Sequence, residues 1–139
     1  MTILEELSEG MDRNLIFTGC LLMALAVVAG AFGAHALQAL LDEKYIDTYH
    51  TAVTYHAYHA LALILTGILH PHARQSLIKS SSRFFLLGLV LFCGSLYILT
   101  LLIAFAKIRY TWLGAITPFG GVCFITGWVL LAVAVRKGR

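Results

Sequence analysis

Residues 84–106 read FFLLGLVLFCGSLYILTLLIAFA, and no Asp, Glu, Lys or Arg interrupts them. The run exceeds the roughly 18–20 apolar residues that cross a hydrocarbon core of about 30 Å as a helix. It shows no alternation of apolar and polar residues, which excludes a membrane-spanning strand. A helix also satisfies its own backbone hydrogen bonds, as a segment in lipid must. The run therefore predicts a transmembrane helix.

Three further runs have the same character, at 14–41, 48–73 and 110–135. Together the four runs predict membrane helices at about 15–37, 49–69, 84–105 and 111–135. Short connections favour antiparallel neighbours. The predicted fold is all-α: an integral membrane antiparallel four-helix bundle in a single domain over 1–139. Apolar residues on one face of 1–12 predict an additional short interfacial helix.

Composition agrees with this fold and excludes several classes of protein. The chain has 60% hydrophobic and 12% charged residues, whereas soluble domains average about 25% charged residues. A soluble enzyme, a nucleic-acid-binding domain and a disulfide scaffold are therefore excluded. The expected surroundings are the lipid bilayer, with another copy or another membrane protein as candidate partners and no nucleic acid.

Basic residues are unevenly distributed between the two ends of the predicted bundle. Lys and Arg favour the cytoplasmic side of a membrane protein. One end carries Arg13, Arg74, Lys79, Arg83, Arg136, Lys137 and Arg139, and the other carries Lys44, Lys107 and Arg109. Both termini are therefore expected in the cytoplasm.

Polar residues inside the spans are concentrated on the second helix. An ionisable residue within a membrane span is a functional-site hypothesis by default. His56 and His59 are three residues apart, so a regular helix can direct both toward one point. We estimate that the polar groups lie in the outer half of the membrane and predict a ligand pocket there. Its candidate residues are His35, Tyr55, His56, His59, Ser95, Tyr97, Thr117, Pro118, Gly120 and Gly121.

Two other roles for these histidines stay open. Neutral histidines that hydrogen-bond Tyr, Thr or Ser would only stabilise the bundle. A metal or haem would need further ligands at the same depth in the membrane. His35 is expected several Å away in depth from His56 and His59. No metal and no cofactor is therefore expected. Because Ser95 and His59 lack an acidic third member of a triad, no catalytic site is predicted and the protein is expected not to be an enzyme.

Small and helix-breaking residues give further expectations. Ala26, Gly30, Gly33, Ala34 and Gly94 are candidate helix-packing positions, within the chain or in a homo-oligomer. Pro118, followed by two glycines, predicts a kinked or locally unwound fourth helix. The serines at 80–82 are expected to cap the third helix.

Four segments resemble a known family. They are GAFGAHAL (30–37), TAVTYHAYHAL (51–61), LFCGSLY (91–97) and ITPFGGVCFITGW (116–128). They are similar to the domain of unknown function 423 family, which comprises small bacterial inner-membrane proteins with eukaryotic relatives. The resemblance implies a four-helix protein of the bacterial cytoplasmic (inner) membrane and carries over no activity. It also implies glutamine at the position of His56, which weakens the metal hypothesis.

Three functional hypotheses follow, in order of preference. The first is a non-enzymatic membrane protein with a His- and Tyr-lined pocket that binds or passes a small solute, an ion or a lipid. The second is an accessory or assembly subunit of a membrane complex whose histidines are structural. The third is a metal or haem site on His56 and His59.

Overall fold

A computed structural model describes residues 9–110 and 112–138 of the chain. The first helix is α2 (Arg13–Phe32), which continues as a π-helical segment, η1 (Gly33–Leu37). The second is α3 (Glu43–Leu69), which ends in a 3-10 turn, η2 (His70–His72). The last is α6 (Leu113–Lys137). The interfacial helix predicted over 1–12 lies largely outside the described residues.

The third helix is assembled from four consecutive pieces. They are α4 (Gln75–Gly88), η3 (Leu89–Gly94), α5 (Ser95–Leu101) and η4 (Leu102–Ala106). Both η3 and η4 are π-helical. The pieces form one continuous rod, Gln75–Ala106, which we call the third helix.

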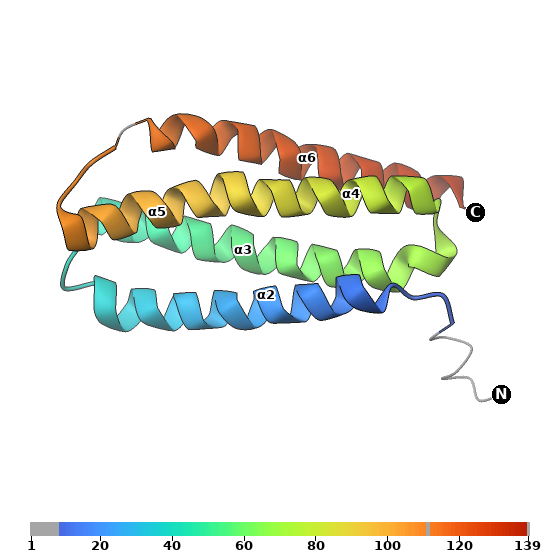
Figure 1. Ribbon diagram of the computed structural model, residues 1–139, viewed down its shortest axis with the longest axis horizontal. Helices are drawn as coiled ribbons and strands as arrows, with labels where there is room; N and C mark the ends of the chain where they lie inside the picture. The colour runs from blue at the N-terminus through green and yellow to red at the C-terminus, as the bar shows by residue number, and fades with distance from the viewer. Residues whose placement is uncertain (1–8, 111, 139) are drawn as a thin grey trace.

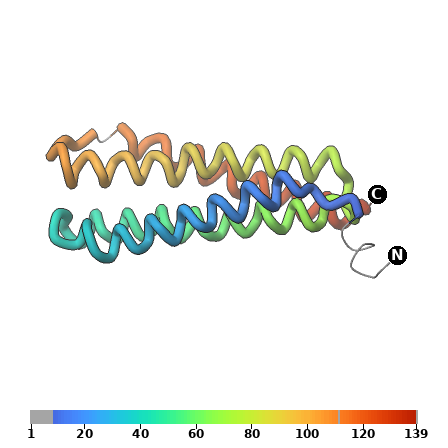
Figure 2. Tube along the Cα trace, turned by 60° about the horizontal axis from the view of Figure 1, so that its bottom comes forward, coloured from blue at the N-terminus to red at the C-terminus, as the bar shows by residue number. Residues whose placement is uncertain are grey.

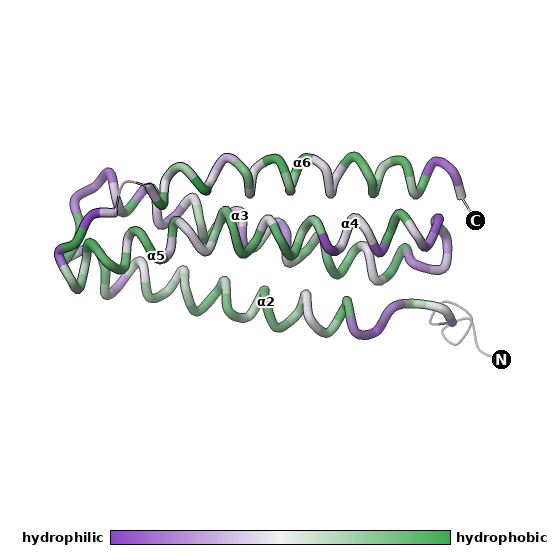
Figure 3. Tube along the Cα trace, turned by 45° about the horizontal axis from the view of Figure 1, so that its top comes forward, coloured by the Kyte–Doolittle hydropathy of each residue, from purple (hydrophilic) through white to green (hydrophobic). Residues whose placement is uncertain are grey.

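All four helices are long and apolar enough to cross a membrane, which confirms the four predicted spans. Figure 3 shows hydrophilic residues gathered near the two ends of the bundle. Asp12 starts α2 as its N-cap, because its carboxylate accepts hydrogen bonds from the backbone N–H groups of Asn14 and Leu15. Lys107 ends the third helix in the left-handed conformation, with φ of 54°.

The helices alternate in direction, so α2 begins and α6 ends at the same end of the bundle (Figure 1). The packing is that of two antiparallel hairpins: α2 lies along α3, and α6 lies along the third helix. Contacts between α3 and the third helix join the two hairpins, whereas α3 and α6 barely touch. Figure 2 shows the two hairpins as two layers. The bundle is therefore joined along one diagonal, and α2 and α6 lie at its outer corners.

Glycines allow close approach within each hairpin. A Cβ on Gly19 of α2 would lie 2.6 Å from Cγ1 of Ile64 and 2.8 Å from the carbonyl oxygen of Ala60, both in α3. A Cβ on Gly127 of α6 would lie 2.6 Å from the ring of Phe85 in the third helix. In lipid there is no hydrophobic driving force between helices, so close packing of this kind stabilises their association.

The helix-packing candidates have different surroundings. Gly33 faces the ring of Tyr49, and Gly30 faces Val53, both in α3. The remaining candidates are Ala26, which is buried, Ala34, which is exposed, and Gly94, whose Cβ would lie 3.9 Å from the carbonyl oxygen of Leu89.

Two local expectations, the serine cap and the unwinding of the fourth helix, are wrong. The third helix begins at Gln75, so Ser81 lies inside it and donates a hydrogen bond of 2.8 Å to the carbonyl of Gly127 in α6 instead of capping a helix end. The fourth helix is not unwound at Pro118, because α6 runs as α-helix from Leu113 to Lys137. Pro118 lies in the second turn of α6, where its missing N–H removes one bond near the helix start. The departures from α-helix geometry occur instead at η1, η3 and η4.

Candidate functional site

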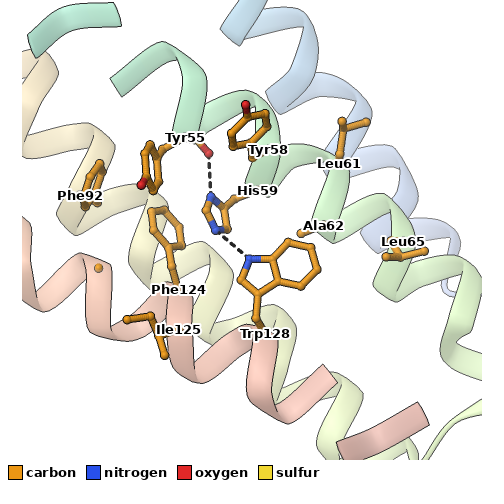
Figure 4. A pocket seen from close by; sticks show the side chains of 11 residues that line it. Tyr55, Tyr58, His59, Leu61, Ala62, Leu65, Phe92, Phe124, Ile125 and Trp128 are labelled. Atoms are coloured by element: carbon orange, nitrogen blue, oxygen red, sulfur yellow. Dashed lines mark hydrogen bonds between the residues drawn. The ribbon is translucent and has the colours of Figure 1, made fainter. Parts of the chain in front are cut away.

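A groove of about 670 Å³ runs between α3 and α6. The two hairpins contact each other through α3 and the third helix. Because α3 and α6 barely touch, a gap remains between them. We call it the His59 groove (Figure 4). Its lining comes from α3, the third helix and α6 and comprises Tyr55, Tyr58, His59, Leu61, Ala62, Leu65, Phe92, Gly121, Phe124, Ile125 and Trp128.

His59 is the histidine in the wall of this groove, and it is only 3% exposed. Its Nδ1 lies 2.7 Å from the carbonyl oxygen of Tyr55, and the indole Nε1–H of Trp128 donates to its Nε2 at 3.2 Å. A carbonyl oxygen only accepts, so Nδ1 must carry the hydrogen, and Nε2 is then the acceptor that Trp128 requires. Both ring nitrogens are satisfied in the neutral Nδ1–H tautomer.

Aromatic stacking holds the imidazole in place. The rings of His59 and Phe124 are nearly parallel, with centroids 3.4 Å apart and an interplanar angle of 10°. The rings of Tyr55 and Phe92 stack at 4.7 Å. The wall of the groove is therefore a rigid aromatic surface whose central polar atoms already bond to each other.

The groove opens on the side of the bundle. Tyr58 is 58% exposed, Leu61 54% and Ile125 66%, so the rim faces outward along the membrane-spanning part of α3 and α6. At 1.5 Å per residue, His59 lies about 18 Å along the helix from Asp47, the nearest charged residue on α3. Trp128 lies about 12 Å from Arg136 on α6. Hydrocarbon is the medium that borders such an opening.

His56 and His59 do not converge. His56 bonds through Nδ1 to the hydroxyl of Tyr97 at 3.2 Å and lines two cavities of about 200 and 420 Å³ between α2 and the third helix. The expectation that both histidines point to one place is therefore wrong. The third helix, which packs on α3, lies between the two sites.

The other predicted pocket residues lie in three further places. Ser95 and Thr117 are 2.9 Å apart and link the third helix to α6 by a side-chain hydrogen bond. Gly120 is buried against the backbone of Phe92, and Pro118 is exposed nearby. His35 is exposed in η1, at the end of α2. Of the ten predicted residues, the His59 groove thus combines Tyr55, His59 and Gly121.

Trp128 and Phe124 are the important residues of the groove that the prediction missed. They are four residues apart on α6, so they lie on one helix face, and Gly121 is one turn before Phe124. The sequence shows this spacing. It does not show which face of the second helix these residues would contact.

The arrangement offers little to a metal ion. Within residues 9–110 and 112–138, no three His, Cys, Asp or Glu side chains are close enough to hold one. The two nitrogens of His59 are already occupied by hydrogen bonds.

Comparison with known proteins gives a consistent result. The model of a family described as "Protein of unknown function (DUF423)" matches residues 29–121. The chain is 41% identical to the UPF0382 membrane protein YwdK of Bacillus subtilis, over 88% of this chain and 95% of that protein. It is also 41% identical to a UPF0382 membrane protein of Staphylococcus haemolyticus, over 88% of this chain and 94% of the relative. No solved structure matches the chain.

Proposed function

The chain belongs to the DUF423 family of membrane proteins, and we propose that it is a non-enzymatic binding protein whose His59 groove holds the acyl chain of a membrane lipid. The family relatives bear the name of membrane proteins and no enzymatic name. We further propose that it resides in the bacterial cytoplasmic (inner) membrane as a multi-pass protein with both termini in the cytoplasm.

One observation carries this proposal: the groove is lateral, aromatic and located far from the charged ends of its helices. Its volume of about 670 Å³ lies within the range of small-molecule sites, about 300–1,000 Å³. The molecules that reach its opening are those dissolved in the bilayer. Nδ1 of His59 is bonded to the carbonyl of Tyr55, and Nε2 accepts the indole N–H of Trp128. Because these groups already have partners, the proposed occupant is hydrocarbon rather than a hydrated solute or an ion.

The accessory-subunit alternative has less support. It relies on faces of small residues that would dock other membrane proteins. Gly30 and Gly33 instead face Val53 and Tyr49 of α3 within the same chain.

Trp128 lines the groove and can report on its occupant. In a Trp112→Phe background it is the one remaining tryptophan. Lipids brominated near the middle of the acyl chain are titrated into detergent-solubilised protein, and quenching of Trp128 fluorescence is followed. We expect saturable quenching, with less quenching when bromine lies near the headgroup.

Two glycine variants form a matched test. A Cβ on Gly121 meets only the Phe92 ring, at 3.9 Å, so Gly121→Leu fills the groove without a backbone clash. It should raise the half-saturating lipid concentration at least about tenfold, which corresponds to about 1.4 kcal/mol. Gly94→Leu, on the opposite side of the third helix, should leave it unchanged. Quenching that does not saturate, or that both variants alter equally, would disprove lipid binding in the His59 groove.

A further inference from the structure

A second groove lies between α2 and the third helix, on the other side from the His59 groove. It consists of the two cavities of about 200 and 420 Å³, and both cavities share His56 and Tyr97 in their lining. The remaining lining is apolar or small and comprises Leu22, Leu25, Val28, Ala29, Phe32, Tyr49, Leu89, Val90, Cys93, Gly94 and Leu101. We call this the His56 groove.

His56 has an unsatisfied polar atom at this position. The residue is 9% exposed, and its Nε2 is buried without a hydrogen-bond partner among the described residues. Leaving a buried donor or acceptor unpaired destabilises a folded protein. In a native structure such an atom calls for a partner, and the groove beside it is where a partner can enter.

The bond to Tyr97 determines what that partner must supply. If Tyr97 donates to Nδ1, then Nε2 carries a hydrogen and is the single unpaired group. If Nδ1 donates instead, both the hydroxyl hydrogen of Tyr97 and the lone pair on Nε2 lack partners. The first arrangement leaves fewer unpaired groups, so Nε2–H is a donor and its missing partner is an acceptor.

Depth restricts the identity of the acceptor. His56 is the middle residue of α3 (Glu43–Leu69), and the ester carbonyls of phospholipids lie at the edges of a hydrocarbon core about 30 Å thick. An acceptor that reaches His56 must therefore belong to a molecule whose polar group enters the hydrocarbon. A conjugated carbonyl on a ring with an apolar chain satisfies this requirement.

We propose that the His56 groove binds a quinone-class molecule, with a ring carbonyl accepting a hydrogen bond from His56 Nε2. The larger cavity, about 420 Å³, is within the size range of small-molecule sites. The π-helical segment η3 (Leu89–Gly94) forms part of the wall, and π-helical segments frequently occur at functional sites. Because Nε2 is buried, a neighbouring side chain must move as the ligand enters.

This site goes beyond the lipid-binding function proposed above and does not depend on it. The two grooves share no lining residue. One can therefore be lost while the other is retained.

The test uses the full chain in lipid nanodiscs and two probes of similar shape. Decyl-1,4-benzoquinone carries two carbonyls, and decylbenzene carries none. We expect the quinone to bind at least about tenfold more tightly than decylbenzene, and its carbonyl stretching band to move to lower wavenumber when bound. His56→Leu should remove this preference and the band shift, while decylbenzene binding stays the same.

Glycine variants separate loss of the site from loss of the fold. A Cβ on Gly94 meets only the carbonyl oxygen of Leu89 among the described residues, at 3.9 Å, so Gly94→Leu fills the His56 groove and should abolish both the preference for the quinone and its band shift. Gly121→Leu should change neither. Equal affinity for the two probes, or a band shift that persists in His56→Leu, would overturn the proposal. If the quinone does not bind and diacylglycerol displaces decylbenzene, the acceptor is a glyceride ester and the quinone class is overturned.

Discussion

Two histidines one helical turn apart have opposite hydrogen-bonding states. His59 has a partner for each ring nitrogen, whereas within the described part of the chain His56 has a partner for Nδ1 alone. In lipid, where water does not supply the missing bond, this difference separates a structural group from a group that is available to a ligand.

The bond between His59 and Trp128 should contribute to stability. Trp128→Phe leaves Nε2 of His59 without its donor, and His59→Phe leaves the indole N–H without its acceptor. Each variant should lower the free energy of unfolding by about 1–3 kcal/mol. The double variant should lose less than the sum, with a coupling of about 0.6–1.7 kcal/mol. Thermal or detergent unfolding of the single and double variants measures this coupling free energy, and Trp112→Phe, at an exposed position, is the control. Strictly additive losses of stability would contradict the bond.

Removing the His56–Tyr97 pair altogether should have a different effect. The double variant His56→Leu, Tyr97→Phe eliminates the unpaired Nε2 and the phenol that bonds to Nδ1. We expect it to be at least as stable as the natural chain, because unpaired buried groups cost about 1–3 kcal/mol. His56→Leu alone leaves the Tyr97 hydroxyl unpaired and should be less stable than the double variant. The reverse order in thermal unfolding would show that the pair itself stabilises the bundle.

At the scale of elements, the third helix and α6 approach each other through glycine and serine. Gly127 lies against Phe85, and its carbonyl accepts the hydroxyl of Ser81. Further along, Gly88 of the third helix lies against Phe124 of α6. Phe124 is thus packed from one side by a glycine and from another by the imidazole of His59, so helix packing helps to fix the wall of the groove.

Enlarging Gly127 should disturb this contact. Its Cβ would lie 2.6 Å from the ring of Phe85, which is fully buried, so Gly127→Leu should lower the free energy of unfolding by about 1–3 kcal/mol or more through overpacking. Gly114→Leu is the control on the same helix, because nothing lies within 4 Å of that position. The melting temperatures of the two variants are compared in the same detergent. Equal melting temperatures would contradict the close contact between Gly127 and Phe85.

The sequence predicted the elements better than their ends and irregularities. Runs free of charge located all four membrane spans, because charged residues are excluded from the bilayer core. The start of the third helix at Gln75 was missed, because a helix that continues into the polar interface leaves no apolar signal. The π-helical segment Leu89–Gly94 has no proline to indicate it, whereas the proline that attracted attention, Pro118, lies inside regular helix.

The candidate site was predictable only in part, for a reason that belongs to the whole molecule. Helix periodicity places His56 and His59 on neighbouring stripes of α3, but the structure packs the third helix along that face. This separates the two side chains into different grooves. Which helix lies against which face depends on the packing of all four, and hydropathy does not encode it.

The orientation of the whole bundle can be tested directly. The start of α2, the turn between α3 and α4 and the end of α6 lie at one end of the bundle (Figure 1). That end carries six of the nine Lys and Arg residues within 9–110 and 112–138. The positive-inside rule predicts that this end faces the cytoplasm. Alkaline phosphatase should be inactive when fused to the C-terminus and active when inserted at 38–42, with green fluorescent protein giving the opposite pattern. Phosphatase activity at the C-terminus would reverse the assignment.

The joining of two hairpins along one diagonal also bears on how the protein is made. Each hairpin closes its backbone hydrogen bonds within its own helices, so α2 with α3 can enter the membrane as a finished pair before the ribosome completes the rest. Only Ala73 and Arg74 separate the end of η2 from the start of α4, which keeps the second pair beside the first. Both grooves are therefore seams between the two pairs, and each takes its shape only when the pairs have met.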